Sequence, residues 1–237
     1  MNNHFERLSS RNLRWAGVVA LALCSTALSG HAEVVYDSTA HVSQDKAFNG
    51  FLTGQGGPYE FGDDVTLAGT SRLVNQFVFH YFGDIANNIV AMATVRFYAN
   101  DVPIPGKTSL APGSLLWQSD PFQVLQGGHV ATMSTPDIEV GDTFTYSIEV
   151  TGVSGVKGNQ FLLLTSTQVA DIGKSFNDFW VKTPTGWGLN QLGTPAGSTR
   201  ADFAVKVSAV PEPSAIALGV LGAVALGGMA LRRNQRR

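Results

Sequence analysis

The sequence predicts an all-β fold, a two-sheet antiparallel β-sandwich of jelly-roll type with about eight to ten strands. Three observations lead to this prediction. Apolar and polar residues alternate along several segments, as they do in half-buried strands. Clusters of Gly, Pro, Asn and Asp separate these segments and predict turns. Between residues 33 and 210, no stretch repeats its apolar residues at the spacing of about 3.6 residues that an amphipathic helix requires.

Residues 1–32 have the parts of a secretory signal peptide. A basic segment extends to Arg14, an uncharged apolar stretch covers residues 15–28, and the small residues Gly30 and Ala32 follow. We expect the secretion machinery to recognise this segment and a signal peptidase to cut after Ala32. The remainder of the chain would then be exported.

Cys24 is the only cysteine of the chain, and it lies within this predicted signal peptide. After cleavage the protein would have no thiol and no disulfide, although export would permit one. Cys24 could instead accept a lipid. Lipoprotein signals place a small residue before the cysteine, however, and the residue here is the bulky Leu23. We therefore prefer the ordinary signal peptide.

Residues 143–151 give the clearest strand pattern. Phe144, Tyr146 and Ile148 share one face, while threonines, a serine and a glutamate share the other. Seven further segments show the same alternation or a short apolar run between turn residues. The eight predicted strands are residues 73–82, 89–99, 114–118, 129–133, 143–151, 160–167, 178–182 and 201–208.

The segment that contains these strands is acidic. Residues 33–210 hold nine Lys and Arg against sixteen Asp and Glu, a net charge of −7, whereas the whole chain has a formal net charge of −2. Binding of nucleic acid depends on basic side chains that neutralise phosphates. The composition therefore argues against a nucleic-acid partner. The chain length of 237 residues leaves room for one ordinary domain, which we expect over residues 33–209.

The C-terminal segment begins with Pro211, Glu212 and Pro213. Residues 215–231 follow without a charge and predict a membrane helix of about 26 Å, which barely spans a bilayer. Residues 232–237 form a basic tail. By the positive-inside rule this tail stays in the cytoplasm and the ectodomain lies on the outer face. The basic residues of the tail are Arg232, Arg233, Arg236 and Arg237.

This order of parts, over residues 210–237, resembles the PEP-CTERM sorting signal of Gram-negative bacteria. The resemblance implies recognition by an exosortase, a membrane-embedded enzyme expected to cut near the Pro-Glu-Pro motif. It also implies a protein anchored in the inner membrane before processing and located afterwards at the cell surface or in the extracellular matrix. The family occurs with exopolysaccharide and biofilm systems. The alternative reading of the tail is a permanent single-span anchor.

A weaker resemblance covers residues 62–153. The segments "FGDDVTLAG", "VRFYANDVPIPG", "SLLWQSDPF" and "VGDTFTYSIEVTGV" are similar to the β-sandwich ectodomains called choice-of-anchor domains, which occur on bacterial surface proteins with interchangeable anchors. That family has no agreed activity. The resemblance therefore implies a location and a fold without implying catalysis.

The sequence offers no set of residues that specifies a reaction. His41, His80 and His129 remain after signal removal, without the spacing of metal ligands on a helix. No nucleophile elbow or phosphate-binding loop is present. The nearest pairs of carboxylates that could serve a glycosidase are Asp63 with Asp64 and Asp137 with Glu139, but such neighbours at loop edges are usually solvated. We expect no catalytic site and no enzymatic activity.

The sequence identifies no metal site either. Calcium is the most reasonable ion for an acidic exported sandwich, because its loops can collect carboxylates and carbonyls. The candidate ligands are Asp63, Asp64, Asp101 and Asp142. None of them lies in a dense DxDxDG loop, and aspartates next to Gly or Asn are also common in plain turns.

Trp187 is the feature that favours glycan binding. It lies between two glycines in a predicted loop, where an exposed indole could stack on a sugar. Asn190 and Gln191 could then supply hydrogen bonds. The plainer alternative is that Trp187 closes one end of the sandwich.

These observations together predict a non-catalytic surface or matrix protein with a structural or adhesive role in exopolysaccharide or biofilm. The second hypothesis is a carbohydrate-binding module that uses a loop aromatic residue, and the third is a secreted hydrolase. Exopolysaccharide is the expected extracellular partner of the first two. Activity on a matrix glycan that disappears when a carboxylate is replaced would favour the third.

Overall fold

The computed structural model describes seven segments of the chain between residue 31 and residue 212. The described residues are 31–47, 59–86, 89–106, 110–152, 160–166, 168–191 and 202–212. One compact unit spans Ala32–Val210. The predicted signal peptide before His31, and the predicted membrane helix and basic tail after Glu212, lie outside the described residues.

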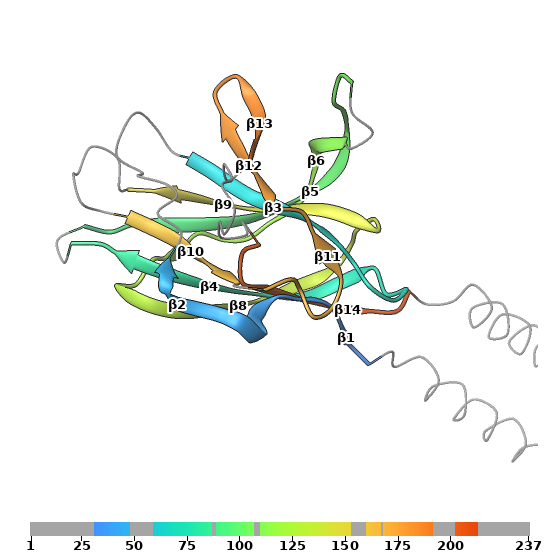
Figure 1. Ribbon diagram of the computed structural model, residues 1–237, viewed down its shortest axis with the longest axis horizontal. Helices are drawn as coiled ribbons and strands as arrows, with labels where there is room; N and C mark the ends of the chain where they lie inside the picture. Colours follow the sequence, from blue (N-terminus) through green and yellow to red (C-terminus); the bar gives the residue numbers. More distant parts are fainter. Residues whose placement is uncertain are drawn as a thin grey trace, which may run out of the picture. The chain divides into compact units, whose positions relative to one another are not determined.

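The compact unit consists of two antiparallel sheets that face each other, which confirms the predicted sandwich (Figure 1). The six-stranded sheet contains β1 (Glu33–Asp37), β2 (Val42–Ala47), β4 (Leu73–Asp84), β8 (Gly127–Glu139), β10 (Gln160–Ser166) and β14 (Val205–Val210). The eight-stranded sheet contains β3 (Tyr59–Thr66), β5 (Met92–Pro103), β6 (Leu110–Gln118), β7 (Phe122–Gln123), β9 (Thr143–Thr151), β11 (Lys174–Ser175), β12 (Asp178–Thr183) and β13 (Gly186–Gln191). A short 3-10 turn, Thr39–His41, connects β1 to β2.

The central strand of the six-stranded sheet is β4. One of its edges pairs with β8, from Leu73 to Gly83. The other edge pairs with β14 along its first part and with β10 along its last part. Because β14 also pairs with β1, the first and last strands of the unit are neighbours, with Glu33 opposite Ala209.

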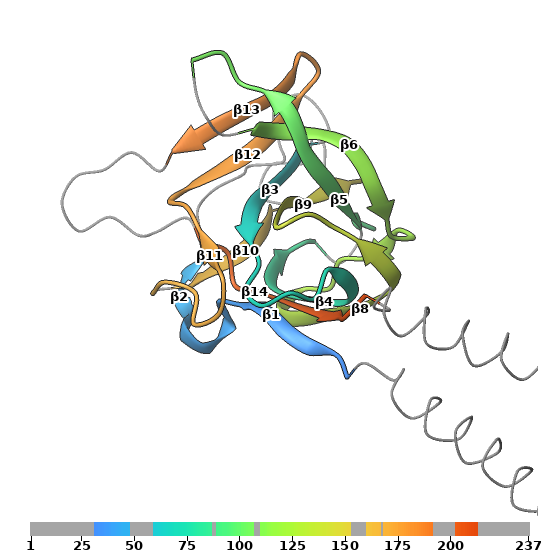
Figure 2. The same ribbon diagram turned by 90° about the vertical axis from the view of Figure 1, so that its right-hand side faces the viewer.

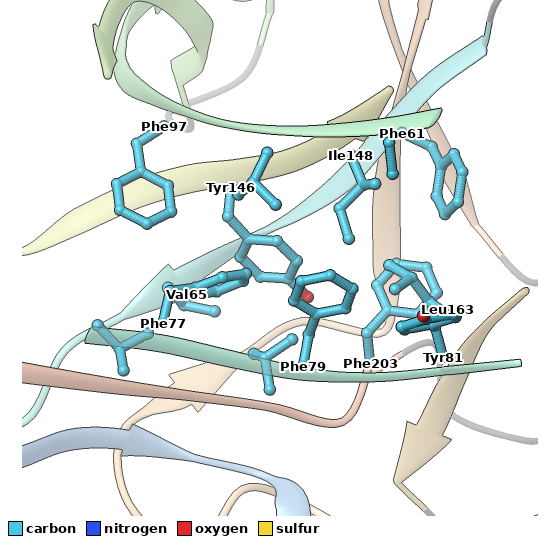
Figure 3. Close-up of a cluster of buried hydrophobic side chains, with 14 of the residues drawn as sticks. Phe61, Val65, Phe77, Phe79, Tyr81, Phe97, Tyr146, Ile148, Leu163 and Phe203 are labelled. Atoms are coloured by element: carbon cyan, nitrogen blue, oxygen red, sulfur yellow. The ribbon is translucent and has the colours of Figure 1, made fainter. Parts of the chain in front are cut away.

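The core lies between the two sheets and is rich in aromatic rings (Figure 3). Phe77 of β4 makes an edge contact with Phe97 of β5 at 5.3 Å between ring centroids, and a tilted contact with Tyr146 of β9 at 5.1 Å. All three side chains are 0% exposed. Alternating residues of β4, β5 and β9 therefore meet across the interior, as the period-two pattern predicts.

The hairpin of β12 and β13 and the hairpin of β5 and β6 extend from the eight-stranded sheet on the side away from the other sheet (Figures 1 and 2). Trp187 lies in β13, directly opposite Lys182 of β12. The prediction of a loop at this position is therefore wrong. The two glycines that flank Trp187 indicated a loop, but both belong to β13 and lie opposite residues of β12, Gly186 with a positive φ of 120°.

Each predicted strand overlaps an observed one, but the described residues contain fourteen strands rather than eight to ten. Six observed strands were not predicted. Four of them are longer, namely β1, β2, β3 and β13, and the other two, β7 and β11, have only 2 residues each. β3 contains a glycine and two aspartates, which have low strand propensity. Its conformation comes from pairing with β9 on one edge and with β11 and β12 on the other.

Candidate functional site

The outer face of the eight-stranded sheet carries a network of charged side chains around Glu60. Glu60 Oε2 lies 3.1 Å from Arg96 Nη1 and 3.1 Å from Lys182 Nζ. Its other oxygen accepts hydrogen bonds from Tyr98 Oη at 2.7 Å and Ser147 Oγ at 2.6 Å. Glu60 is only 4% exposed, and four donors from three neighbouring strands satisfy its carboxylate.

The donors around Glu60 hold it in the ionised form. Burial raises its pKa, but the hydrogen bonds from Ser147 and Tyr98 and the charges of Lys182 and Arg96 outweigh burial, so the pKa of Glu60 lies below its ordinary value. The pKa of Lys182 is raised: burial opposes its charge, but Tyr98 and Glu60 favour it more. Arg96 also pairs with Glu149, with 2.6 Å between its Nη2 atom and Glu149 Oε2, so the network contains two carboxylates and two cations.

An aromatic platform adjoins this network. We use this name for Tyr98, Trp187 and Lys182. The rings of Tyr98 and Trp187 meet edge to face at 5.3 Å, and Lys182 Nζ lies 5.0 Å from the first ring and 5.2 Å from the second. Trp187 is half-buried and contributes to an open outer face of the hairpin. The platform thus combines a partly exposed indole with a fixed cation.

Of the other two predicted glycan contacts, Asn190 is not next to Trp187 on this surface. In the pairing of β12 with β13, Asn190 lies opposite Phe179 and so belongs to the opposite face of the hairpin from Trp187. Asn190 Nδ2 donates to Gly188 O at 3.4 Å. Gln191 ends β13, and its side chain lies outside the described part of the structure. Tyr98 and Lys182, which the sequence analysis did not select, are the residues that contact Trp187.

A second polar group lies at the edge of β3. Carboxylate oxygens of Asp63, Asp64 and Asp178 lie within 4.8 Å of one another. Asp63 is 0% exposed, and burial, followed by the charges of Asp64, Asp202 and Asp178, raises its pKa well above the ordinary value. We call Asp63, Asp64, Asp178 and Asp202 the carboxylate cluster. A side chain as buried as Asp63 cannot touch a polysaccharide directly.

The remaining acidic candidates lie elsewhere. Asp142 pairs with Arg72, with 2.7 Å between its Oδ1 and Nη2 of the arginine. Asp101 accepts a hydrogen bond from the backbone N–H of Ser114 within the β5–β6 hairpin. Of the four aspartates predicted as calcium ligands, the structure therefore joins only Asp63 and Asp64. Asp137 and Glu139, the other predicted carboxylate pair, are exposed on β8.

Two of the three histidines line a groove on the outer face of the six-stranded sheet. The groove has a volume of about 530 Å³ and includes His80, Phe82, His129 and Leu164. Burial lowers the pKa of His80, so its neutral form is favoured. His41 lies apart, with its Nε2 atom 3.7 Å from Asp171 Oδ1. The lining of this groove contains no Asp, Glu, Lys or Arg side chain.

The predicted sorting motif follows the last strand of the six-stranded sheet. Pro211 and Glu212 are exposed immediately after β14. Pro213, the helix predicted over residues 215–231 and the four arginines lie outside the described residues. Within the described part of the chain, no helix has the length and hydropathy needed to cross a membrane.

Comparison with protein-family models identifies a PEP-CTERM protein-sorting motif at residues 209–237. This match agrees with the resemblance found in the sequence and begins within β14. Comparisons with curated proteins and with solved structures found no match. The weaker resemblance of residues 62–153 to choice-of-anchor domains has no support from these comparisons and stays a prediction.

Proposed function

We propose that this chain, an exported PEP-CTERM protein that exosortase recognises through residues 209–237, is a non-catalytic structural or adhesive component of the extracellular polysaccharide matrix. The motif marks a protein that is anchored in the membrane before exosortase cleavage and is then released to the cell surface. The role in the matrix is our inference from that destination.

The observation that carries the proposal is the position of the motif relative to the fold. β14 ends at Val210, and Pro211 and Glu212 follow it as exposed residues. Cleavage next to these residues would leave β14 paired with β1 and β4. The released product would therefore be a complete sandwich, as a protein that serves by its folded surface requires.

The charge network gives Glu60 a structural role rather than that of a general acid. A glycosidase general acid needs a raised pKa to remain protonated near neutral pH. Glu60, the buried carboxylate of the outer face, has a lowered pKa and accepts its hydrogen bonds from residues of the sheet itself. These properties suit a side chain that stabilises the contacts between neighbouring strands.

The test is the mass of the intact protein and of its terminal peptides, measured separately for the membrane and matrix fractions of the native host. We expect a matrix form that begins near Glu33 and ends between residues 211 and 214. Deletion of exosortase, or a Glu212→Ala substitution, should retain the protein in the membrane with Arg237 present. The Asp142→Asn variant, changed at a side chain that is 86% exposed, is the matched control and should be processed normally.

A membrane form that keeps Arg237 in cells with active exosortase would make the tail a permanent anchor and overturn the matrix role. A correctly processed protein that appears only in the culture medium, with none retained by the matrix, would contradict the structural or adhesive role while leaving the sorting intact. The two parts of the proposal can thus fail separately.

A carbohydrate-binding role is the second candidate, and the aromatic platform is the observation that favours it. A half-buried indole with a lysine at 5.2 Å can stack on a sugar and contact its hydroxyl or acidic groups. Trp187→Ala should then reduce retention on purified matrix polysaccharide without changing the unfolding midpoint. Phe82→Ala, at an aromatic residue 39% exposed on the other sheet, is the control. Equal retention of Trp187→Ala and the wild type would exclude this role for the platform.

A further inference from the structure

The carboxylate cluster lies where the pairing of β3 is interrupted. Along one edge, β3 pairs with β12 through Glu60, Phe61 and Gly62, and with β11 through Val65 and Thr66. Asp63 and Asp64 lie between these two pairings, and the short connection from β11 to β12 passes them. The gap therefore places two adjacent carboxylates beside the start of β12, where Asp178 is located.

The fourth carboxylate reaches the cluster from the segment before β14. Asp202 is 1% exposed, and its Oδ1 atom accepts a hydrogen bond from Ser175 Oγ of β11 at 2.8 Å. Its charge acts on Asp63 as well as on Tyr36 and Tyr146. Side chains from β3, β11, β12 and the segment before β14 therefore lie close together.

Buried polar atoms at this position lack partners, and they are the independent sign of a ligand. Asp63 Oδ2 and Tyr146 Oη are both buried and have no hydrogen-bond partner among the described residues. Tyr146 is 0% exposed, lies directly opposite Asp63 in the pairing of β3 with β9, and points from β9 into the interior (Figure 3). Native proteins rarely leave such groups unsatisfied, so each one requires an explanation.

The surroundings of Asp63 and Asp64 point to a missing positive charge beside these two carboxylates. Asp63 and Asp64 form no ion pair within the part of the chain that the structure describes. The nearest strong cation on β12, Lys182, already pairs with Glu60. Adjacent buried carboxylates repel each other and lose their hydration, and a bound cation would remove both penalties at once.

We propose that Asp63, Asp64 and Asp178 bind one calcium ion in the gap of the β3 edge, with Asp202 as an additional carboxylate of the site. The donors are oxygens, which hard cations prefer, and the cluster contains no thiol or imidazole. Calcium ligands lie about 2.3 to 2.6 Å from the ion, so two of them can be at most about 5 Å apart. The observed separation of up to 4.8 Å fits this geometry.

The ion would connect the start of β12 to β3 beside the residues of β3 that pair with neither β11 nor β12. Asp64 and Asp178 are only half-buried, so two of the proposed ligands remain in contact with solvent, whereas Asp63 is fully buried. An exported protein meets calcium at the high concentrations for which extracellular sites are built, with dissociation constants of about 0.1 to 1 mM. Binding is thus expected after export.

Trp180 provides a direct reporter of occupancy. Its Nε1–H donates to Asp64 Oδ1 at 3.1 Å, so the indole lies beside a proposed ligand. Terbium, which takes calcium sites and emits when a nearby indole is excited, is the optical probe. The experiment uses the purified full-length chain, first treated with EDTA and then titrated with terbium, calcium or magnesium.

We expect terbium luminescence on excitation of Trp180, its displacement by calcium, and a rise of the unfolding midpoint by several degrees in calcium that magnesium does not match. Asp178→Asn should weaken calcium binding at least about tenfold, because the site loses one charged ligand. Trp180→Phe should lose the luminescence and keep the stabilisation by calcium. Asp101→Asn, at an aspartate of the β5–β6 hairpin, is the control and should behave as the wild type.

The carboxylate variants also distinguish a calcium site from a cluster whose carboxyl groups are protonated and bind no ion. In EDTA, Asp64→Asn should unfold at a higher temperature than the wild type, because the charge that repels Asp63 most strongly is gone. In calcium the order should reverse. A wild type whose unfolding midpoint is the same in EDTA and in calcium, with no displaceable terbium emission, would overturn the proposal.

Discussion

Lys182 Nζ lies 3.1 Å from Glu60 Oε2, and the two residues are directly opposite each other on β12 and β3. Arg96 reaches the same carboxylate oxygen from β5, which does not pair with β3. One glutamate therefore connects three strands across the outer face of the eight-stranded sheet. Its removal would leave two cations facing each other without their common partner.

Glu60→Gln is expected to lower the free energy of unfolding by about 2 kcal/mol at neutral pH. Loss of one member of a buried ion pair leaves its partner uncompensated, and the effect is moderated here because Lys182 is 39% exposed and Arg96 keeps its pair with Glu149. Urea unfolding measures the change. Asp142→Asn, which breaks the exposed pair with Arg72, should cost less than about 1 kcal/mol. Equal losses in the two variants would contradict the assigned role of Glu60.

The pH dependence of stability should reveal the same residue. The pKa of Glu60 is lower in the folded chain than its ordinary value of 4.5, so the unfolded chain binds more protons as the solution becomes acid. The stability that Glu60 contributes is therefore complete above about pH 5 and is lost as the pH falls through the folded pKa. We expect the difference in unfolding free energy between wild type and Glu60→Gln to be constant from about pH 7 to 5 and to shrink below that. A difference independent of pH would show that Glu60 titrates normally.

Gly62→Ala should destabilise the sandwich by more than about 2 kcal/mol. A Cβ atom on Gly62 would overlap the carbonyl oxygen of Tyr146 and lie 2.6 Å from the Cα atom of Ser147, so β3 and β9 would have to separate. Gly128→Ala is the matched control, because the nearest atom to its Cβ would be Phe82 Cδ2 at 4.0 Å. The control should change stability by less than about 1 kcal/mol in thermal or urea unfolding. A stable Gly62→Ala variant would contradict the close approach of these strands.

Phe77→Ala should lower the unfolding free energy by about 3 to 5 kcal/mol, because it opens a cavity between the two sheets. The ring of Phe77 contacts Phe97 and Tyr146 from the facing sheet and is fully buried. Val130→Ala removes an apolar group that is 57% exposed and should change stability by less than about 0.5 kcal/mol. Similar losses for both variants would argue against a core centred on Phe77.

A chain limited to residues 33–210 should unfold cooperatively with a free energy within about 1 kcal/mol of the full-length protein, because it retains all the strands of both sheets. A chain that ends at residue 204 should lack a cooperative transition. It loses β14, on which β1 and the first part of β4 depend for pairing. Circular dichroism during urea unfolding distinguishes these outcomes. A folded product without β14 would contradict the placement of that strand within the sheet.

The sequence predicted the fold through strands whose side chains alternate regularly. Residues 143–151 are an example, since the predicted strand coincides with β9 and Phe144, Tyr146 and Ile148 all lie in the core. β3 escaped prediction because Asp63 occupies a core-facing position between Phe61 and Val65. An apolar residue there would have completed the alternation, so the break in the pattern coincides with the carboxylate cluster.

The composition of the candidate sites was harder to predict than the fold. The sequence drew attention to Asp63 and Asp64 because they are adjacent, but it gave no reason to join them to Asp178 and Asp202, which approach them only through the order of strands in the sheet. The same holds for Trp187. Its partner Tyr98 lies on a different hairpin, and the contact depends on how the two hairpins fold over one sheet.

The pairing of β1 with β14 determines when the protein can fold during its passage out of the cell. β1 is the first strand to emerge and β14 the last, yet they are neighbours, and β14 also supplies one edge of the central strand β4. The six-stranded sheet therefore closes only after residue 210 has left the export channel. Until then, the apolar faces and unpaired edges of the other strands are exposed and prone to aggregate with other chains. A tail that holds the emerging chain at the membrane would keep it away from such encounters while the last strand takes its place.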